Sequence, residues 1–221
     1  MILEPGSKLL FIGDSVTDCG RSQPTGEGLG DALGRGYVSL VDSLLGAAHP
    51  ELGIRVVNVG TSGQTVRDLQ ARWKRDVLDL RPDWLSVMIG INDVWRQFDM
   101  PRRPEAGIPL DVYETTLREI VAEARPRLKG LVLMTPFYIE PNPADAMRAR
   151  MDEYGAVVGR IADEQDAVFV DTQAAFAPVL ARYHSSSIAW DRVHPNHIGH
   201  MILARAFLNA IGFTWDSVGP A

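Results

Sequence analysis

The sequence predicts an α/β fold in which a five-stranded parallel sheet lies between two layers of helices. Five short apolar segments alternate with helical patterns, and the first three of these segments each end in a glycine followed by polar residues. No repeat, low-complexity tract or linker divides the 221 residues. Strands that alternate with helices form parallel sheets through right-handed crossovers. We therefore expect one three-layer sandwich domain, residues 1–221.

The first apolar segment, residues 9–12, is too short and too uniformly apolar for an amphipathic helix. Gly13 ends it, as expected for a buried strand of a parallel sheet. Ser15 then lies at the carboxyl edge of the sheet, where open α/β folds bind their ligands. A serine at this place is either a nucleophile or a cap for the next helical turn.

The remaining strands follow the same pattern. Gly60 comes directly after the second strand and Gly90 after the third, and the carboxyl ends of parallel strands meet at one edge. The loops after the first three strands should therefore lie together. The predicted strands cover residues 9–12, 54–59, 84–89, 131–134 and 168–171.

Apolar residues at helical spacing, such as Leu117, Val121 and Ala124, predict the helices between these strands. Three segments contain glycine, proline or charged residues instead, and we expect them to be loops that border a site. The predicted helices cover residues 37–48, 65–80, 111–127, 147–164, 174–183 and 198–211, and the predicted loops cover residues 16–36, 95–110 and 135–143.

Composition limits the possible partners. A chain that is 46% hydrophobic and 23% charged can bury a stable core. A net charge of -6 without blocks of like charge makes nucleic acid and anionic membranes poor partners. No apolar stretch approaches the ~20 residues that span a bilayer. With Cys19 as the only cysteine and no signal-peptide pattern in residues 1–8, we expect a cytoplasmic protein with a small substrate.

Asp191 and His194 are close enough in one loop for the carboxylate to hold one imidazole nitrogen. The other nitrogen can then take the proton of Ser15, as in nucleophilic acyl transfer. That chemistry also needs donors for the developing oxyanion. The amides of Ser15 and Gly60 and the side-chain amide of Asn92 are candidates, because each follows a strand. Taken singly, Gly60 could only relieve a turn and Asn92 could only cap a helix.

Four segments together resemble the sequence blocks of the SGNH (GDSL) hydrolase family. They are Gly13-Asp14-Ser15, Gly60, Gly90-Ile91-Asn92-Asp93 and Asp191-Arg192-Val193-His194. The resemblance implies a flavodoxin-like fold with Ser15 as nucleophile, His194 as base and Asp191 as its orienting carboxylate. It also implies an oxyanion hole formed by Ser15, Gly60 and Asn92. Val16 replaces the usual leucine, which leaves the chemistry intact, and the absence of a Gly-x-Ser-x-Gly elbow disfavours the α/β-hydrolase fold.

Residues 11–21, 89–97 and 189–195 are more closely similar to those of bacterial intracellular acetylxylan esterases. This resemblance implies that the protein removes acetyl groups from xylo-oligosaccharides without a cofactor. Such relatives are commonly oligomeric, so we expect a homo-oligomer.

A metal-dependent deacetylase is one alternative, because His194, His197 and His200 recur every third residue. Pro195 separates His194 from the helix predicted for the other two histidines, and no second ligand cluster occurs in the sequence. We therefore expect no metal ion.

A lipase or thioesterase on the same fold is the nearer alternative, and a sugar-binding module without activity is a third. The predicted loops carry charged residues and scattered aromatic rings, which suit a sugar better than an acyl chain. We expect Asp14, Trp95, Tyr138 and Trp190 to contact the substrate, although Trp190 is equally suited to a subunit contact. The polar rim consists of Arg96, Asp99, Arg102, Arg103, Glu105 and Asn142.

Overall fold

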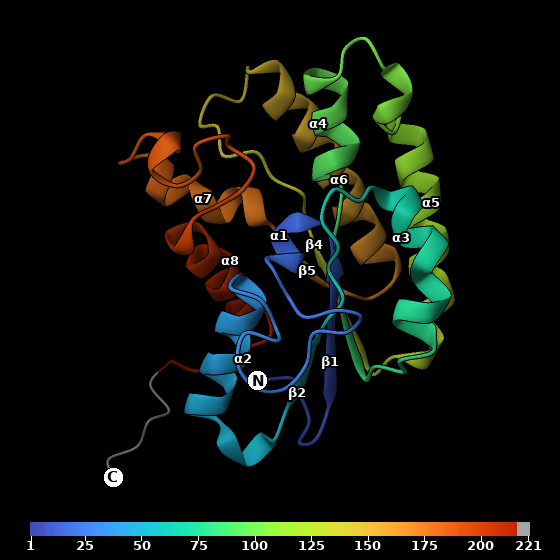
Figure 1. The fold of residues 1–221 in the computed structure, drawn as a ribbon, viewed down its shortest axis with the longest axis vertical. Helices are drawn as coiled ribbons and strands as arrows, with labels where there is room; N and C mark the ends of the chain where they lie inside the picture. The colour runs from blue at the N-terminus through green and yellow to red at the C-terminus, as the bar shows by residue number, and fades with distance from the viewer. Residues whose placement is uncertain (216–221) are drawn as a thin grey trace.

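The computed structural model describes residues 1–215, which form a five-stranded parallel sheet with helices on both faces (Figure 1). The strands lie in the order β2-β1-β3-β4-β5, which confirms the predicted fold class. Their bounds are β1 (Lys8–Gly13), β2 (Arg55–Asn58), β3 (Trp84–Met88), β4 (Gly130–Met134) and β5 (Val168–Val170).

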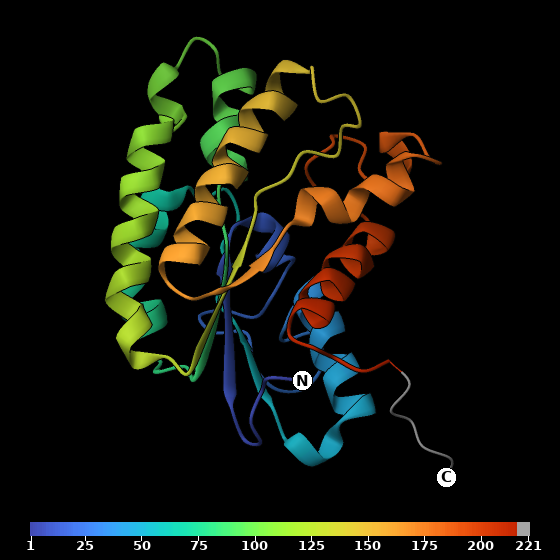
Figure 2. The same cartoon turned by 180° about the vertical axis from the view of Figure 1, so that it is seen from behind.

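Two helical layers cover the sheet. Helices α2, α7 and α8 lie on one face, and α3, α4, α5 and α6 lie on the other, as the opposite views in Figures 1 and 2 show. The bounds are α1 (Ser15–Asp18), α2 (Tyr37–Ala48), α3 (Val66–Trp73), α4 (Ile91–Asp99), α5 (Leu110–Ala124), α6 (Ala146–Glu164), α7 (Thr172–Leu180) and α8 (His197–Ala210). No helix within residues 1–215 combines the length and the apolar composition that a membrane span requires.

The central strands are buried on both faces because both layers of helices pack against them, which explains why their sequences are almost entirely apolar. In the register between β1 and β3, Gly13 pairs with Met88. Strands β1 and β3 therefore end at the same level. The chain passes to β2 on one side of β1 and to β3 on the other, and a ligand site is expected outside the strand ends at such a switch point.

The structure differs from the sequence prediction at two segments that matter for the site. Residues 16–18 of the predicted loop belong to helix α1, which begins at Ser15 and is capped by the Asp14 side chain. Residues 95–99 belong to helix α4 instead of a loop, because Ile91 and Val94 lie on one buried helical face. Apolar residues recur at the spacing of a helix in α4, at Ile91, Val94, Trp95 and Phe98, but the charged residues and the three prolines between residues 95 and 110 favoured a loop. Helix α4 begins directly after β3 and therefore carries Asn92 in its first turn.

Candidate active site

Three side chains that are far apart in the sequence form one chain of hydrogen bonds. Ser15, the first residue of α1, has its Oγ 2.9 Å from Nε2 of His194. Nδ1 of His194 lies 2.6 Å from Oδ2 of Asp191. Because the carboxylate accepts the Nδ1 proton, Nε2 is left as the acceptor for the Ser15 hydroxyl proton. This tautomer is the one that a general base requires.

The turn around Asp191 holds the imidazole in place. Oδ1 of Asp191 accepts the backbone amides of Val193 at 3.0 Å and His194 at 2.8 Å. Burial alone would raise the pKa of Asp191, but the hydrogen bonds from His194 and from these amides hold that pKa below its usual range. The carboxylate thus stays ionised at neutral pH and can stabilise an imidazolium.

The segment after β4 secures the same turn. The amide of Ile139 donates to the carbonyl of Arg192 at 2.9 Å, and Nη1 of Arg192 lies 2.8 Å from Oε2 of Glu140. Arg192 has a φ of 63°, a left-handed conformation that a non-glycine residue adopts only when its surroundings impose it. These two contacts supply that constraint between Asp191 and His194.

Asn92 presents its side-chain amide to the pocket that contains Ser15. Nδ2 donates to the carbonyl of Gln64 at 2.9 Å, while Nη2 of Arg96 donates to Oδ1 at 3.2 Å. These contacts fix which end of the amide carries the nitrogen. One N–H of Nδ2 remains for a ligand, and the amide of Ser15, at the first position of α1, has no acceptor within that helix.

The prediction that Gly60 forms the oxyanion hole does not agree with the structure. The amide of Gly60 donates to Oδ1 of Asn58 at 2.8 Å, and Gly60 is buried below the pocket. A Cβ at Gly60 would lie 2.3 Å from the backbone nitrogen of Asp18, so this glycine permits a close approach of two backbones. Its role is to let the loop after β2 pack against α1.

Gly63, three residues after Gly60, is a candidate for the donor that was predicted at Gly60. It lines the pocket beside Ser15, and its amide makes no hydrogen bond within residues 1–215. Its φ of 80° is accessible to glycine, and the preceding residue, Ser62, donates its amide and hydroxyl to Oδ2 of Asp18. The second glycine of the Gly60-Thr61-Ser62-Gly63 sequence was the available signal for this donor.

The four side chains predicted to bind the substrate lie in different environments. Trp95 lines the pocket, with its ring centroid 5.7 Å from that of His194. Asp14 is buried, accepts the amide of Val16, and does not line the pocket. Burial raises the pKa of Asp14 to about 6. Tyr138 and Trp190 do not line the pocket, and Trp190 is 84% exposed.

The three histidines of the alternative metal site do not converge. His194 faces Ser15, whereas His200 has its Nδ1 occupied by the amide of Tyr37 at 3.2 Å and its Nε2 3.5 Å from Sγ of Cys19. Burial lowers the pKa of His200 to about 4, so its imidazole is neutral and serves as a cap for α2. Within residues 1–215, no group of three His, Cys, Asp or Glu side chains is arranged to hold a metal ion.

Comparison with known proteins agrees with this geometry. The chain is 61% identical over 215 residues to an acetylxylan esterase of Geobacillus stearothermophilus, and the match covers 97% of this chain and 98% of the relative. Crystal structures of Axe2, an acetylxylan esterase of that organism, match with a TM-score of 0.96, 61% identity and the same coverage. Three of them are catalytic mutants in which a serine, a histidine or an aspartate is replaced by alanine.

An alpha/beta hydrolase enzyme from the metagenome of Lake Arreo, Spain, also matches, with 52% identity, a TM-score of 0.94, and coverage of 96% of this chain and 98% of that chain. The model of the GDSL-like lipase/acylhydrolase family matches residues 11–202. This match spans the chain from β1 to α8, including Ser15, Asn92 and His194. The chain therefore belongs to the GDSL-like lipase/acylhydrolase family.

Proposed function

We propose that this protein is a serine esterase that removes acetyl groups from short xylo-oligosaccharides. The observation that carries the proposal is the continuous hydrogen-bonded arrangement of Ser15, His194 and Asp191 at the edge of the sheet. The acetylxylan esterase that is 61% identical over nearly the whole chain supports the choice of substrate.

In the first half of the proposed reaction, Oγ of Ser15 attacks the acetyl carbonyl carbon while Nε2 of His194 takes the hydroxyl proton. The negative charge that forms on the carbonyl oxygen is stabilised by the amides of Ser15 and Gly63 and by Nδ2 of Asn92. The tetrahedral intermediate then collapses. The C–O bond to the sugar breaks, and the sugar oxygen takes the proton from His194.

In the second half, a water molecule attacks the acetyl group on Ser15, and His194 takes a proton from this water. The second tetrahedral intermediate expels Oγ of Ser15, which regains a proton from His194, and acetic acid leaves. No step needs a metal or an organic cofactor, because the chain itself supplies nucleophile, base and oxyanion donors. Asp191 stabilises the imidazolium in both halves.

The pocket favours a sugar over a long acyl chain. Its walls combine the Trp95 ring with polar groups from Ser62, Asn92 and Arg96, and the Arg96 guanidinium stacks 4.6 Å from the centroid of the Trp95 ring. Polar groups beside an aromatic side chain suit a hydroxylated ligand. A lipase or thioesterase activity remains the second candidate, because the family description includes lipases.

Self-association and a cytoplasmic location belong to the same proposal. Several large apolar side chains are exposed near the ends of α7 and α8, and an interface between copies of this chain would cover them. The single cysteine rules out an internal disulfide and is compatible with a reducing compartment. The exposed side chains are Tyr183, Trp190, Ile198 and Met201.

The substrate is tested by measuring kcat/KM for acetyl, butyryl and octanoyl esters of one leaving group, followed by acetate release from acetylated xylo-oligosaccharides. We expect acetate to be preferred, since each methylene that the acyl site cannot accept costs ~1–3 kcal/mol. Faster cleavage of octanoate would assign the protein to the lipases or thioesterases. Rapid cleavage of simple acetyl esters with no release from the oligosaccharides would retain the esterase and reject the sugar.

A further inference from the structure

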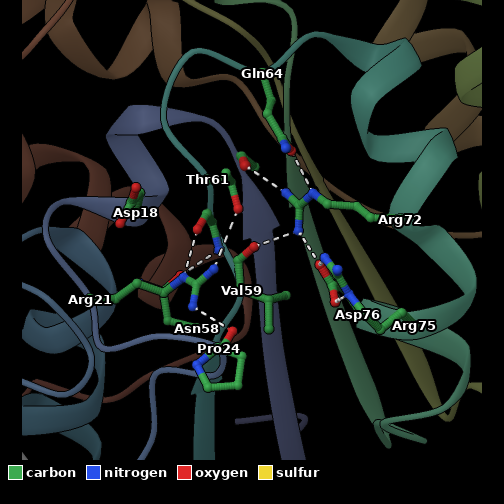
Figure 3. A network of polar contacts seen from close by, with 12 residues as sticks. Asp18, Arg21, Pro24, Asn58, Val59, Thr61, Gln64, Arg72, Arg75 and Asp76 are labelled. Carbon is green, nitrogen blue, oxygen red and sulfur yellow. Dashed lines mark hydrogen bonds and ion pairs between the residues drawn. The ribbon is translucent and has the colours of Figure 1, made fainter.

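A buried guanidinium contacts chain segments that adjoin the proposed oxyanion donors. Arg72, on helix α3, is 7% exposed, and its donors reach three separate chain segments (Figure 3). Nη2 donates to the carbonyl of Gly13 at 3.1 Å, Nη1 donates to the carbonyl of Val59 at 2.6 Å, and Nε donates to the side-chain oxygen of Gln64. One planar group thus contacts the end of β1, the end of β2 and the loop that follows β2.

Two of these acceptors are close in sequence to a proposed oxyanion donor. Gly13 precedes Ser15 by two residues, and Gln64 directly follows Gly63. The main-chain carbonyl of Gln64 in turn accepts Nδ2 of Asn92 at 2.9 Å. Arg72 is therefore linked, through one or two contacts, to all three donors, although it does not line the pocket itself.

The charge of Arg72 is balanced within the same cluster. Nη1 lies 2.9 Å from Oδ2 of Asp76, which also accepts from the exposed Arg75. Burial lowers the pKa of Arg72, but a guanidinium starts so high that the group stays charged. A lysine ammonium could not replace it, because only the guanidinium directs five donors along fixed directions in one plane.

Helix α3 has other means of stabilisation, so its formation does not require Arg72. Thr65 and Asp68 form a reciprocal capping box at its amino terminus, and Val66, Leu69 and Trp73 are buried in the core. Apart from the ion pair with Asp76, the hydrogen bonds of Arg72 go to the strand ends and to the loop that carries Gly63.

We propose that Arg72 is a positioning residue that keeps the Ser15, Gly63 and Asn92 donors converging on one oxygen atom. This inference rests on the proposed esterase mechanism and adds a residue to it. A displacement of such donors by about 1 Å is enough to reduce the rate of the chemical step by up to roughly 10²-fold. The effect should appear in kcat more than in KM, since the donors act on charge that develops during the reaction.

The test compares kcat and KM of R72K, N92A and the double variant on an acetyl ester, with thermal unfolding of each. We expect R72K to lower kcat by roughly 10-fold to 10²-fold with KM changed by less than about twofold. The effects of R72K and N92A should be less than additive, because both act on the same oxyanion. R75A is the matched control, since Arg75 contacts Asp76 but no strand end, and it should retain wild-type kcat.

The alternative outcomes are distinct. An R72K variant with wild-type kcat, or with a loss fully additive to that of N92A, would overturn the role of Arg72. An N92A variant with wild-type kcat would overturn the proposed site and the role of Arg72 together. If R72K does not fold, Q64A is measured in its place. This variant removes only the side-chain oxygen that accepts Nε of Arg72, and the proposal requires that its kcat fall by the same factor.

Discussion

The two sides of Ser15 are built in contrasting ways. On one side, Asp191 and His194 belong to a single short turn, and the His194 side chain is 43% exposed. On the other side, Gly63 and Asn92 come from different strand ends, and buried groups such as Asn58 and Arg72 hold their loops from below. A local sequence pattern is enough to build the first side. The second depends on the fold.

This contrast predicts different responses to mutation. A change on the exposed side removes a chemical group and leaves the core intact. A change on the buried side alters both the geometry of the donors and the stability of the fold. Variants of the exposed side should therefore lose kcat alone, whereas variants of the buried side should lose both kcat and stability.

The largest effect is expected for Ser15→Ala and His194→Ala. Nucleophile and base act as one unit, and a loss of about 10⁶ in kcat is known for such groups in subtilisin. The melting temperature should stay near that of the wild type, because both side chains lie at the surface of the site. Purified variants are compared by acetyl ester hydrolysis and thermal unfolding. Retention of a tenth of the wild-type rate by either would contradict their assignment.

A smaller effect is expected for Asn92→Ala, which removes one oxyanion donor and leaves nucleophile and base in place. Loss of one such donor costs roughly 10²–10³ in kcat, with little change in KM. Steady-state kinetics on an acetyl ester measures both constants. A change confined to KM would instead make Asn92 a residue that binds the ground state of the substrate.

Most of the sheet could be predicted from the sequence, because its central strands are buried on both faces and are almost entirely apolar. Helix α4 was missed although Ile91, Val94, Trp95 and Phe98 recur at helical spacing, because the charged residues and the three prolines of residues 95–110 favoured a loop. The strand order was not predictable, since it depends on which crossovers pass which face of the sheet.

The site residues that could be predicted are those whose contacts are local in the sequence. The spacing of Asp191 and His194 within one turn predicted their contact directly. The choice between Gly60 and Gly63 depended on the path of a loop, and that path is set by Asn58, which accepts the Gly60 amide at 2.8 Å. Asn58 lies within a strand and shows no sign of this role in the sequence. The burial of Asp14 was likewise determined by packing beyond its own segment.

The last prediction concerns Asp93, a buried carboxyl group that adjoins Asn92. Its Oδ1 accepts the amide of Val66 at 3.0 Å, whereas its Oδ2 is buried and makes no hydrogen bond within residues 1–215. Burial raises the pKa of Asp93 to about 7, and the nearby carboxyl of Asp14 adds to the rise. The folded protein therefore keeps a proton here that the unfolded chain releases near pH 4.

Between about pH 4 and pH 7 the folded state binds more protons at Asp93 than the unfolded state, so the free energy of unfolding falls as pH rises, by at most about 1.4 kcal/mol per pH unit. Asp93→Asn has no such proton, keeps the acceptor for Val66, and should lose this dependence.

Urea unfolding of both proteins at pH 4.5, 6 and 8 should show similar stability at the lowest pH and a relatively more stable variant at pH 8. His200, whose pKa is lowered to about 4, titrates in both proteins and cancels in the difference. Parallel stability curves for the two proteins would show that Asp93 does not hold its proton in the folded state. The kcat of the variant should change by less than about tenfold, because its Oδ1 keeps the contact between α4 and the Val66 amide of α3.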